Sequence, residues 1–122
     1  MTARQFLVIF VHAVAGWLLC GATIGVAMAT TTIDKALVIH AVLAPLYFVG
    51  ITLIYCRAFN YTRPLVTAIL FTVIVMLLDF FVVALLVYGN LVMFESALGT
   101  WIPFASIFVA TYLTGLAAAK PR

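Results

Sequence analysis

Four long apolar runs, separated by short polar breaks, make up most of this chain. They cover residues 5–28, 36–56, 65–88 and 92–116. Each run is close to the roughly 20 apolar residues that a helix needs to cross the core of a bilayer. The runs are continuous, whereas the strands of a membrane β-barrel alternate between apolar and polar positions. The pattern therefore predicts an all-α integral membrane protein, built as a bundle of four transmembrane helices.

The breaks between the runs are short and carry turn signals. Pro64, at the start of the third run, suits the first turn of a helix, where its missing N–H is no loss. Gly89 and Asn90 form a turn signal before the fourth run. Such short connections make consecutive helices antiparallel neighbours. We therefore expect a single up-and-down membrane domain that covers residues 1–122.

Composition supports the membrane interpretation. Of the 122 residues, 68% are hydrophobic and only 7% are charged, whereas a soluble domain carries about 25% charged residues. A water-soluble surface cannot be made from this chain, so the lipid bilayer is its first expected partner. The first run is longer than the apolar region of a signal peptide, so we interpret it as a membrane helix. No basic patch indicates a nucleic-acid partner.

The Lys and Arg residues are distributed unequally between the two sides of the predicted bundle. One side carries Arg4, Arg57, Arg63, Lys120 and Arg122, and the other side carries Lys35 alone. The positive-inside rule places the richer side in the cytoplasm. The prediction is a multi-pass protein of the cytoplasmic (inner) membrane with both termini inside.

An acid near the middle of the third run is the least expected residue of the chain. Placing Asp79 at the centre of a membrane helix costs roughly 2.5–3.5 kcal/mol on insertion scales, so we expect it to be partnered or protonated. Thr72 shares its helix face, and His40 is its preferred partner by depth, slightly nearer the outer surface. Glu95 is expected near the outer boundary, at the start of the fourth helix.

Two prolines fall near the middle of their predicted helices. Pro45 and Pro103 each remove a backbone hydrogen bond to the carbonyl four residues earlier, which belongs to Ala41 and to Gly99. Interrupted helices at corresponding positions in two halves of a small transporter indicate a binding site, although proline kinks are common in membrane helices without one. The predicted ligand or proton site consists of these residues of the outer half: Asp79, His40, Glu95, Thr72, Gly99 and Ala41.

Small residues form stripes on the first and fourth helices. Small residues let membrane helices approach closely, so these stripes predict packing within the bundle, across a homo-oligomer, or against a partner membrane protein. Trp17 and Trp101 are too deep for the interfacial belt and are also predicted to pack, and His12 is expected to be a packed, hydrogen-bonded residue. The predicted packing positions are Gly16, Gly21, Gly25, Ser106, Ala110 and Thr114.

Three segments resemble those of short prokaryotic four-helix integral membrane proteins of uncharacterised function: FNYT at 59–62, DFFVVALL at 79–86 and LGTWIPF at 98–104. The resemblance covers most of the chain and implies no activity. The chain differs from the small multidrug-resistance transporters, because its first helix has His12 and lacks their membrane-embedded Glu. It also lacks the Arg- and Asn-bearing patterns of the fluoride channels.

Three classes of function remain. The first is a small proton-coupled or cation/small-molecule transporter-like protein with Asp79 and His40 at its site. The second is a non-catalytic accessory or assembly subunit, in which the same pair would only fix how two helices meet. The third and weakest is a haem- or metal-binding redox protein using His12 and His40. No nucleophile–base pair, nucleotide loop or metal-type cysteine spacing is present, so no enzyme, cofactor or metal site is predicted.

Overall fold

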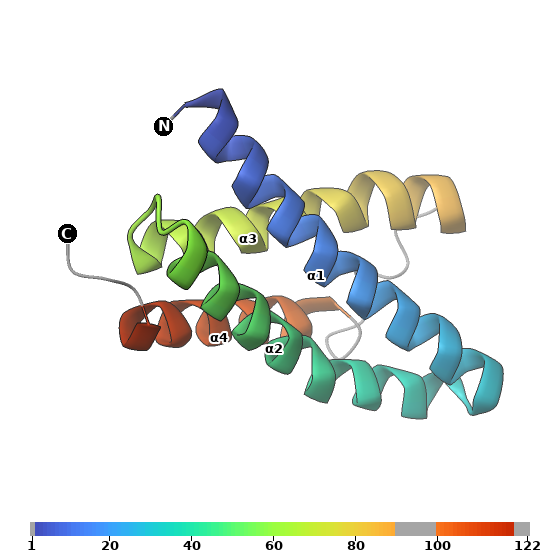
Figure 1. The fold of residues 1–122 in the computed structure, drawn as a ribbon. Coiled ribbons are helices and arrows are strands. Elements are labelled where there is room, and N and C mark those ends of the chain that lie inside the picture. Colours follow the sequence, from blue (N-terminus) through green and yellow to red (C-terminus); the bar gives the residue numbers. More distant parts are fainter. Residues whose placement is uncertain (1, 90–99, 119–122) are drawn as a thin grey trace.

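The computed structural model describes residues 2–89 and 100–118. Within these ranges the chain forms a packed all-α bundle (Figure 1), as predicted. Its elements are α1 (Ala3–Thr30), α2 (Ile33–Ala58), α3 (Pro64–Leu78), the π-helical segment η1 (Asp79–Tyr88) and α4 (Ile102–Ala118).

Three helical stretches are long and apolar enough to cross a membrane. They are α1, α2 and the continuous stretch Pro64–Val82, which runs from α3 into η1. The described part of α4 is a shorter apolar helix of 17 residues. The chain is therefore a small polytopic membrane protein by length and composition of its helices.

Local sequence signals explain where the first three helices begin. Thr2 and Gln5 form a capping box at the start of α1, in which each side chain binds the backbone N–H of the other residue. Thr32 caps α2 by accepting a hydrogen bond from the backbone N–H of Lys35. Pro64 is the first residue of α3, as the sequence predicts.

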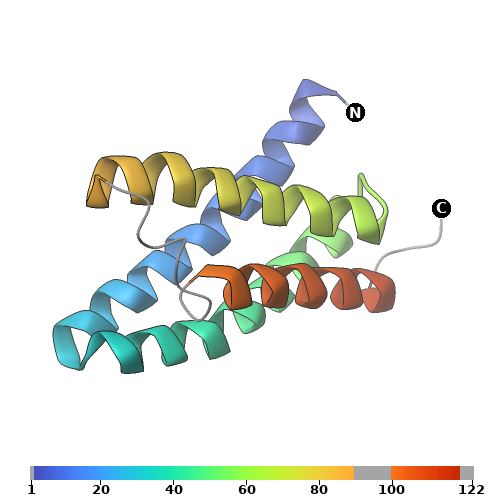
Figure 2. The ribbon, with the colours of Figure 1, turned by 180° about the vertical axis from the view of Figure 1, so that it is seen from behind.

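The helices are arranged so that α1 and α4 both contact α2 and α3. α1 crosses diagonally over the other helices in Figure 1, and the reverse view in Figure 2 shows α3 and α4 side by side. Three fully buried aromatic rings fill the space between α2 and α3. The ring centroids of Phe48 and Phe71 are 6.1 Å apart, and those of Tyr55 and Phe71 are 5.7 Å apart.

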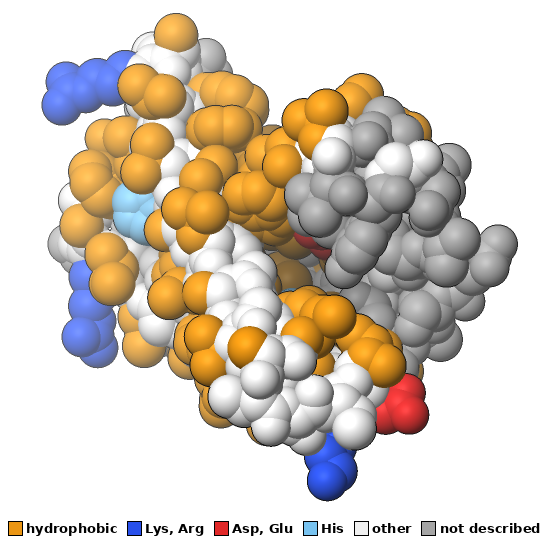
Figure 3. All heavy atoms as spheres, turned by 90° about the vertical axis from the view of Figure 1, so that its right-hand side faces the viewer, with side chains coloured by type: hydrophobic (Ala, Val, Ile, Leu, Met, Phe, Trp, Pro, Cys, Tyr) orange, Lys and Arg blue, Asp and Glu red, His pale blue; other side chains and the backbone are white. Residues whose placement is uncertain are grey.

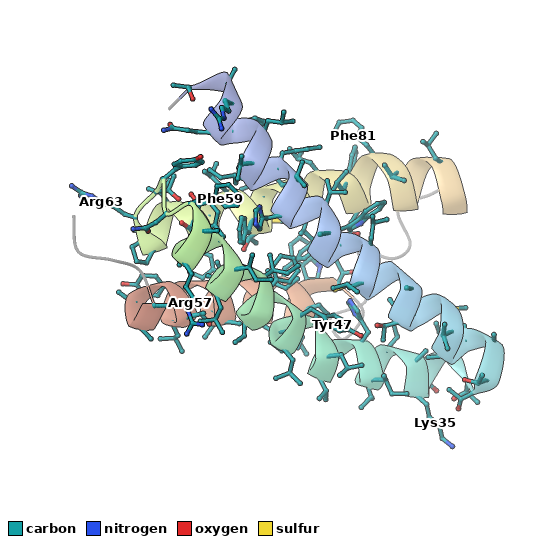
Figure 4. The ribbon with its side chains drawn as sticks, in the orientation of Figure 1. Lys35, Tyr47, Arg57, Phe59, Arg63 and Phe81 are labelled. Atoms are coloured by element: carbon teal, nitrogen blue, oxygen red, sulfur yellow. The ribbon has the colours of Figure 1, made fainter. Side chains whose placement is uncertain are left out.

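The outside of the bundle has the character that a bilayer requires. Many large hydrophobic side chains are exposed along the helices, and Figure 3 shows a mainly hydrophobic face with the basic side chains at its margin. Figure 4 shows Lys35 at the opposite end of the molecule from Arg57 and Arg63. The labelled basic residues thus lie near the ends of the apolar helices.

The geometry of the third helix departs from the predicted regular helix at 65–88. α3 ends at Leu78, and from Asp79 onward the chain winds in the wider π-helical form. Single-turn π-bulges inside α-helices are frequent at functional sites, whereas η1 is ten residues long. The change of winding begins at the partly buried Asp79.

The two prolines lie at different places in the described helices. Pro45 lies inside α2, as expected. Pro103 is the second residue of α4 and follows two π-helical residues, Thr100 and Trp101. The preceding part of the predicted fourth helix lies outside the described residues, so the kink at Pro103 stays a prediction.

The small-residue stripe of α1 has two parts with different environments. Gly16 is buried, and a Cβ added there would lie 2.5 Å from the ring of Phe48, so only glycine allows this approach of α1 and α2. Gly21 and Gly25 have nothing within 4 Å of the same built position. They lie on the outer surface of α1 and are not packing positions within the bundle.

The predicted packing stripe on α4 is not its buried face. Ser106, Ala110 and Thr114 are only partly buried, and the Ser106 hydroxyl donates to the Ile102 carbonyl of its own helix. Each of these three predicted positions is one residue before a residue that is buried against the other helices. The buried face consists of Phe104, Ile107, Thr111 and Gly115, the last in close contact with Pro64.

The close contact at Gly16 predicts a specific sensitivity. Gly16→Ala should destabilise the fold by about 1–3 kcal/mol, because the added methyl group overpacks against the buried Phe48 ring. Gly50→Ala is the matched control, since open space surrounds Gly50 on α2. Unfolding in detergent measures both free energies. Equal stability of the two variants would contradict the packing described here.

Candidate functional site

The partly buried acid Asp79 is hydrogen-bonded across two helices. The indole Nε1–H of Trp17, on α1, donates to the Oδ1 atom of Asp79 at a distance of 2.8 Å. An indole N–H has no acceptor in lipid and must find one inside the protein. A carboxylate in the same region needs a donor for the same reason. The bond therefore satisfies one polar group of each helix.

The contact of α1 with α3 brings the two residues together. Trp17 is in the middle part of α1, and Asp79 directly follows the last residue of α3. At 1.5 Å per residue, Trp17 lies about 21 Å from the start of α1 and Asp79 about 22 Å from the start of α3. Because α1 crosses the other helices diagonally in Figure 1, the pairing depends on where α1 and α3 meet.

Cys20 lies one turn beyond Trp17 on the same face of α1. Its side chain is 6% exposed, and it is close enough to Asp79 for an electrostatic interaction. α1 therefore presents a hydrogen-bond donor and a thiol to the carboxyl group. Phe81, two residues after Asp79, is 56% exposed and points away from the bundle (Figure 4).

His40 does not partner Asp79 in the structure, contrary to the preferred pairing from the sequence. Its side chain is buried, with 7% exposed, and its Nδ1 atom has no hydrogen-bond partner among the described residues. The hydrogen bond that reaches Asp79 comes from Trp17. The prediction from the sequence rests on the depth of ionisable residues alone. The indole N–H of Trp17 is a neutral donor, and so this prediction does not include it.

The other predicted site residues have separate positions. Thr72 lies two turns before Asp79 on α3, and its buried hydroxyl lacks a hydrogen-bond partner among the described residues. Ala41 is partly buried on α2, four residues before Pro45. Glu95 and Gly99 lie outside the described residues. Within the described chain, direct hydrogen bonding links Asp79 only to Trp17.

A second polar cluster lies where α2 is connected to α3. The Tyr55 hydroxyl is 2.8 Å from that of Thr62 and accepts a hydrogen bond from the backbone N–H of Tyr61. The hydroxyls of Thr62 and Thr67 are 2.6 Å apart, and Thr67 also donates to the carbonyl of Arg63. These bonds satisfy one another, so the cluster fixes the connection and leaves little bonding capacity for a ligand.

His12 belongs to the packing around this second cluster. Its Nδ1 atom is 2.7 Å from the carbonyl oxygen of Val8, and its ring meets those of Tyr55 and Phe59 edge to face. The expectation of a packed, hydrogen-bonded histidine is confirmed. Farther along α1, the Thr23 hydroxyl is 2.6 Å from the Tyr47 hydroxyl, and this hydrogen bond joins α1 to α2.

Metal chemistry has no evident centre in the part of the chain that is described. No group of three or more His, Cys, Asp and Glu side chains there is arranged to hold a metal ion. Cys20 and Cys56 are both buried free thiols.

Comparison of the chain with known protein families, with curated proteins and with solved structures found no match. No family is identified for this small four-helix protein with three long apolar helices. The functional argument therefore rests on the residues around Asp79.

The Trp17–Asp79 bond predicts an energetic coupling between α1 and α3. Trp17→Phe keeps the aromatic bulk and removes the donor, and should cost about 0.6–1.7 kcal/mol, the average and the maximum that double-mutant cycles give for hydrogen bonds between membrane helices. In the background of Asp79→Leu the same change should cost little, because the acceptor is already gone. Unfolding of the four proteins of this double-mutant cycle in detergent measures the coupling. Additive effects would contradict the bond.

Proposed function

We propose that this chain is a small transporter-like membrane protein that binds a proton-coupled ligand at Asp79. The observation that carries the proposal is the single bond from Trp17 to one oxygen of this carboxyl group. An indole N–H is a neutral donor, so it orients the carboxylate without neutralising its charge. A buried charge that is not neutralised by a partner is costly. A proton or a positively charged ligand is the natural means of removing that cost.

The local geometry supports a binding role over a purely structural one. A carboxylate that only joins two helices is best served by a second donor, which the described residues do not provide for Asp79. The change from α- to π-helical winding at the same residue alters the backbone next to the carboxyl group, and single-turn π-bulges are frequent at functional sites. Intramembrane acids are functional candidates for the same energetic reason.

Orientation follows from the positive-inside rule. With Arg4, Arg57 and Arg63 on the cytoplasmic side and Lys35 outside, both termini are cytoplasmic in the inner membrane. Asp79 then lies in the outer half. His40 and Thr72, whose buried polar atoms lack partners among the described residues, are candidates for additional ligand contacts.

The proposal predicts a specific loss in one variant. Asp79→Asn should abolish a pH-dependent uptake or ligand response in proteoliposomes while the protein still folds, because asparagine preserves the shape and an acceptor for Trp17 but cannot exchange a proton. Asp34→Asn is the matched control, since Asp34 is exposed in the first turn of α2. A pH-dependent response that survives in Asp79→Asn would rule out the proposed site.

A second candidate function is an accessory or assembly subunit that binds partner helices. The observation in its favour is the open space beside Gly21 and Gly25 on the outer face of α1, where a GxxxG spacing permits close helix contact. Loss of a co-purifying partner in Gly21→Leu, with retention in Gly50→Leu, is the result that would favour it. Under this candidate, Asp79→Asn would leave flux unaffected.

A further inference from the structure

We infer that the ligand bound at Asp79 is a monovalent cation, which replaces the proton of the carboxyl group one for one. This inference rests on the proposed function and specifies its ligand class and coupling. Its basis is the balance of charge around the carboxyl group, together with the donor atoms available there.

The charges of the described chain leave Asp79 isolated. The other described acid is Asp34, exposed at the start of α2. The basic residues of the described helices, Arg4, Lys35 and Arg57, are exposed near helix ends. Among the described residues Asp79 is therefore the only carboxyl group that is partly buried, and no basic side chain of these residues forms an ion pair with it.

Neutrality then selects the charge of the ligand. Ionised Asp79 carries one negative charge, and the Trp17 N–H that binds it is neutral. One proton or one monovalent cation makes the site neutral. A divalent cation would leave a net positive charge, and a neutral or anionic ligand would leave a net negative one, each in surroundings where an unbalanced charge is unfavourable.

The atoms that could coordinate a ligand at Asp79 also favour a monovalent cation. Trp17 already occupies the Oδ1 atom, so the Oδ2 atom of Asp79 is the main anionic contact that remains. Divalent metals require several oxygen ligands, or three or more His, Cys and carboxylate ligands. The described residues contain no group of three or more His, Cys, Asp and Glu side chains placed to hold a metal ion. An alkali ion with a partial hydration shell, or an ammonium-type cation, needs fewer protein ligands.

Exchange at one carboxyl group couples the cation to the proton. When the cation binds, the Asp79 O–H bond breaks, the proton passes to bulk water, and the cation takes its place beside the carboxylate. Cys20 of α1 is the titratable group that interacts with Asp79, and the described part of α4 contains no Asp, Glu, Lys, Arg, His or Cys. On α2, His40 makes no hydrogen bond to Asp79. The proton released should therefore come from Asp79.

Calorimetry and proton release on the purified full-length protein in nanodiscs test the inference. The two probes are sodium ion and tetraethylammonium. They distinguish a site for an inorganic cation from a site for an organic cation. At least one probe should bind with release of one proton per cation. Its affinity should fall about tenfold per pH unit on acidification, where the proton occupies the site. Asp79→Asn should lose binding and release, and Asp34→Asn should keep both.

The results distinguish failure of the monovalent-cation inference from failure of the proposed function. Release of two protons with a divalent cation, binding without proton release, or binding of neither probe would overturn the inference. If flux of a neutral solute remains pH-dependent and is lost in Asp79→Asn, the proposed function holds and the monovalent-cation inference fails. If Asp79→Asn changes neither flux nor binding, both fail.

Discussion

The hydrogen bond between Trp17 and Asp79 is the interaction on which the rest of this account depends. It joins α1 to the third helix at the residue where α3 changes to π-helical winding. In lipid, neither an indole N–H nor a carboxyl group can turn to water for a partner. The bond therefore satisfies both groups and also fixes how far α1 and α3 can slide past each other.

Close packing holds this bond in register. Gly16 lies one residue before Trp17 and lets α1 approach the Phe48 ring of α2. Phe48 in turn contacts Phe71 on α3. At the other end of the bundle, the Tyr55 hydroxyl binds the connection between α2 and α3. Polar bonds at two levels and aromatic packing between them thus determine the arrangement of the helices.

Most of the fold could be predicted from the sequence, because apolar runs of the length of a bilayer leave little choice other than helices. The position of Asp79 along its helix and the packed state of His12 followed from the same simple rules. The hydrogen-bond partner of Asp79 does not follow from those rules, because depth and charge compare ionisable residues with one another. The indole N–H of Trp17 is a neutral donor, and it carries no signal in such a comparison.

Other features depend on tertiary contacts that a pattern of residue types does not encode. The π-helical winding from Asp79 leaves no signal in composition or spacing. On α4, Thr111 and Gly115 face the bundle while Ser106 and Thr114 are only partly buried. A helix that is apolar on all sides gives no periodicity from which its buried face can be chosen. The same reason explains why Gly21 and Gly25 could not be placed inside or outside from the sequence.

Infrared difference spectroscopy of the carboxyl C=O stretch, on protein in lipid, tests most directly whether Asp79 is a proton-exchanging site. The account predicts an absorption of a protonated carboxyl group that is lost on raising the pH, shifts when a cation is added, and is absent from Asp79→Asn. A carboxyl group that keeps one protonation state over the whole pH range in which the protein stays folded, with or without cation, would contradict the account and leave Asp79 as a link between two helices.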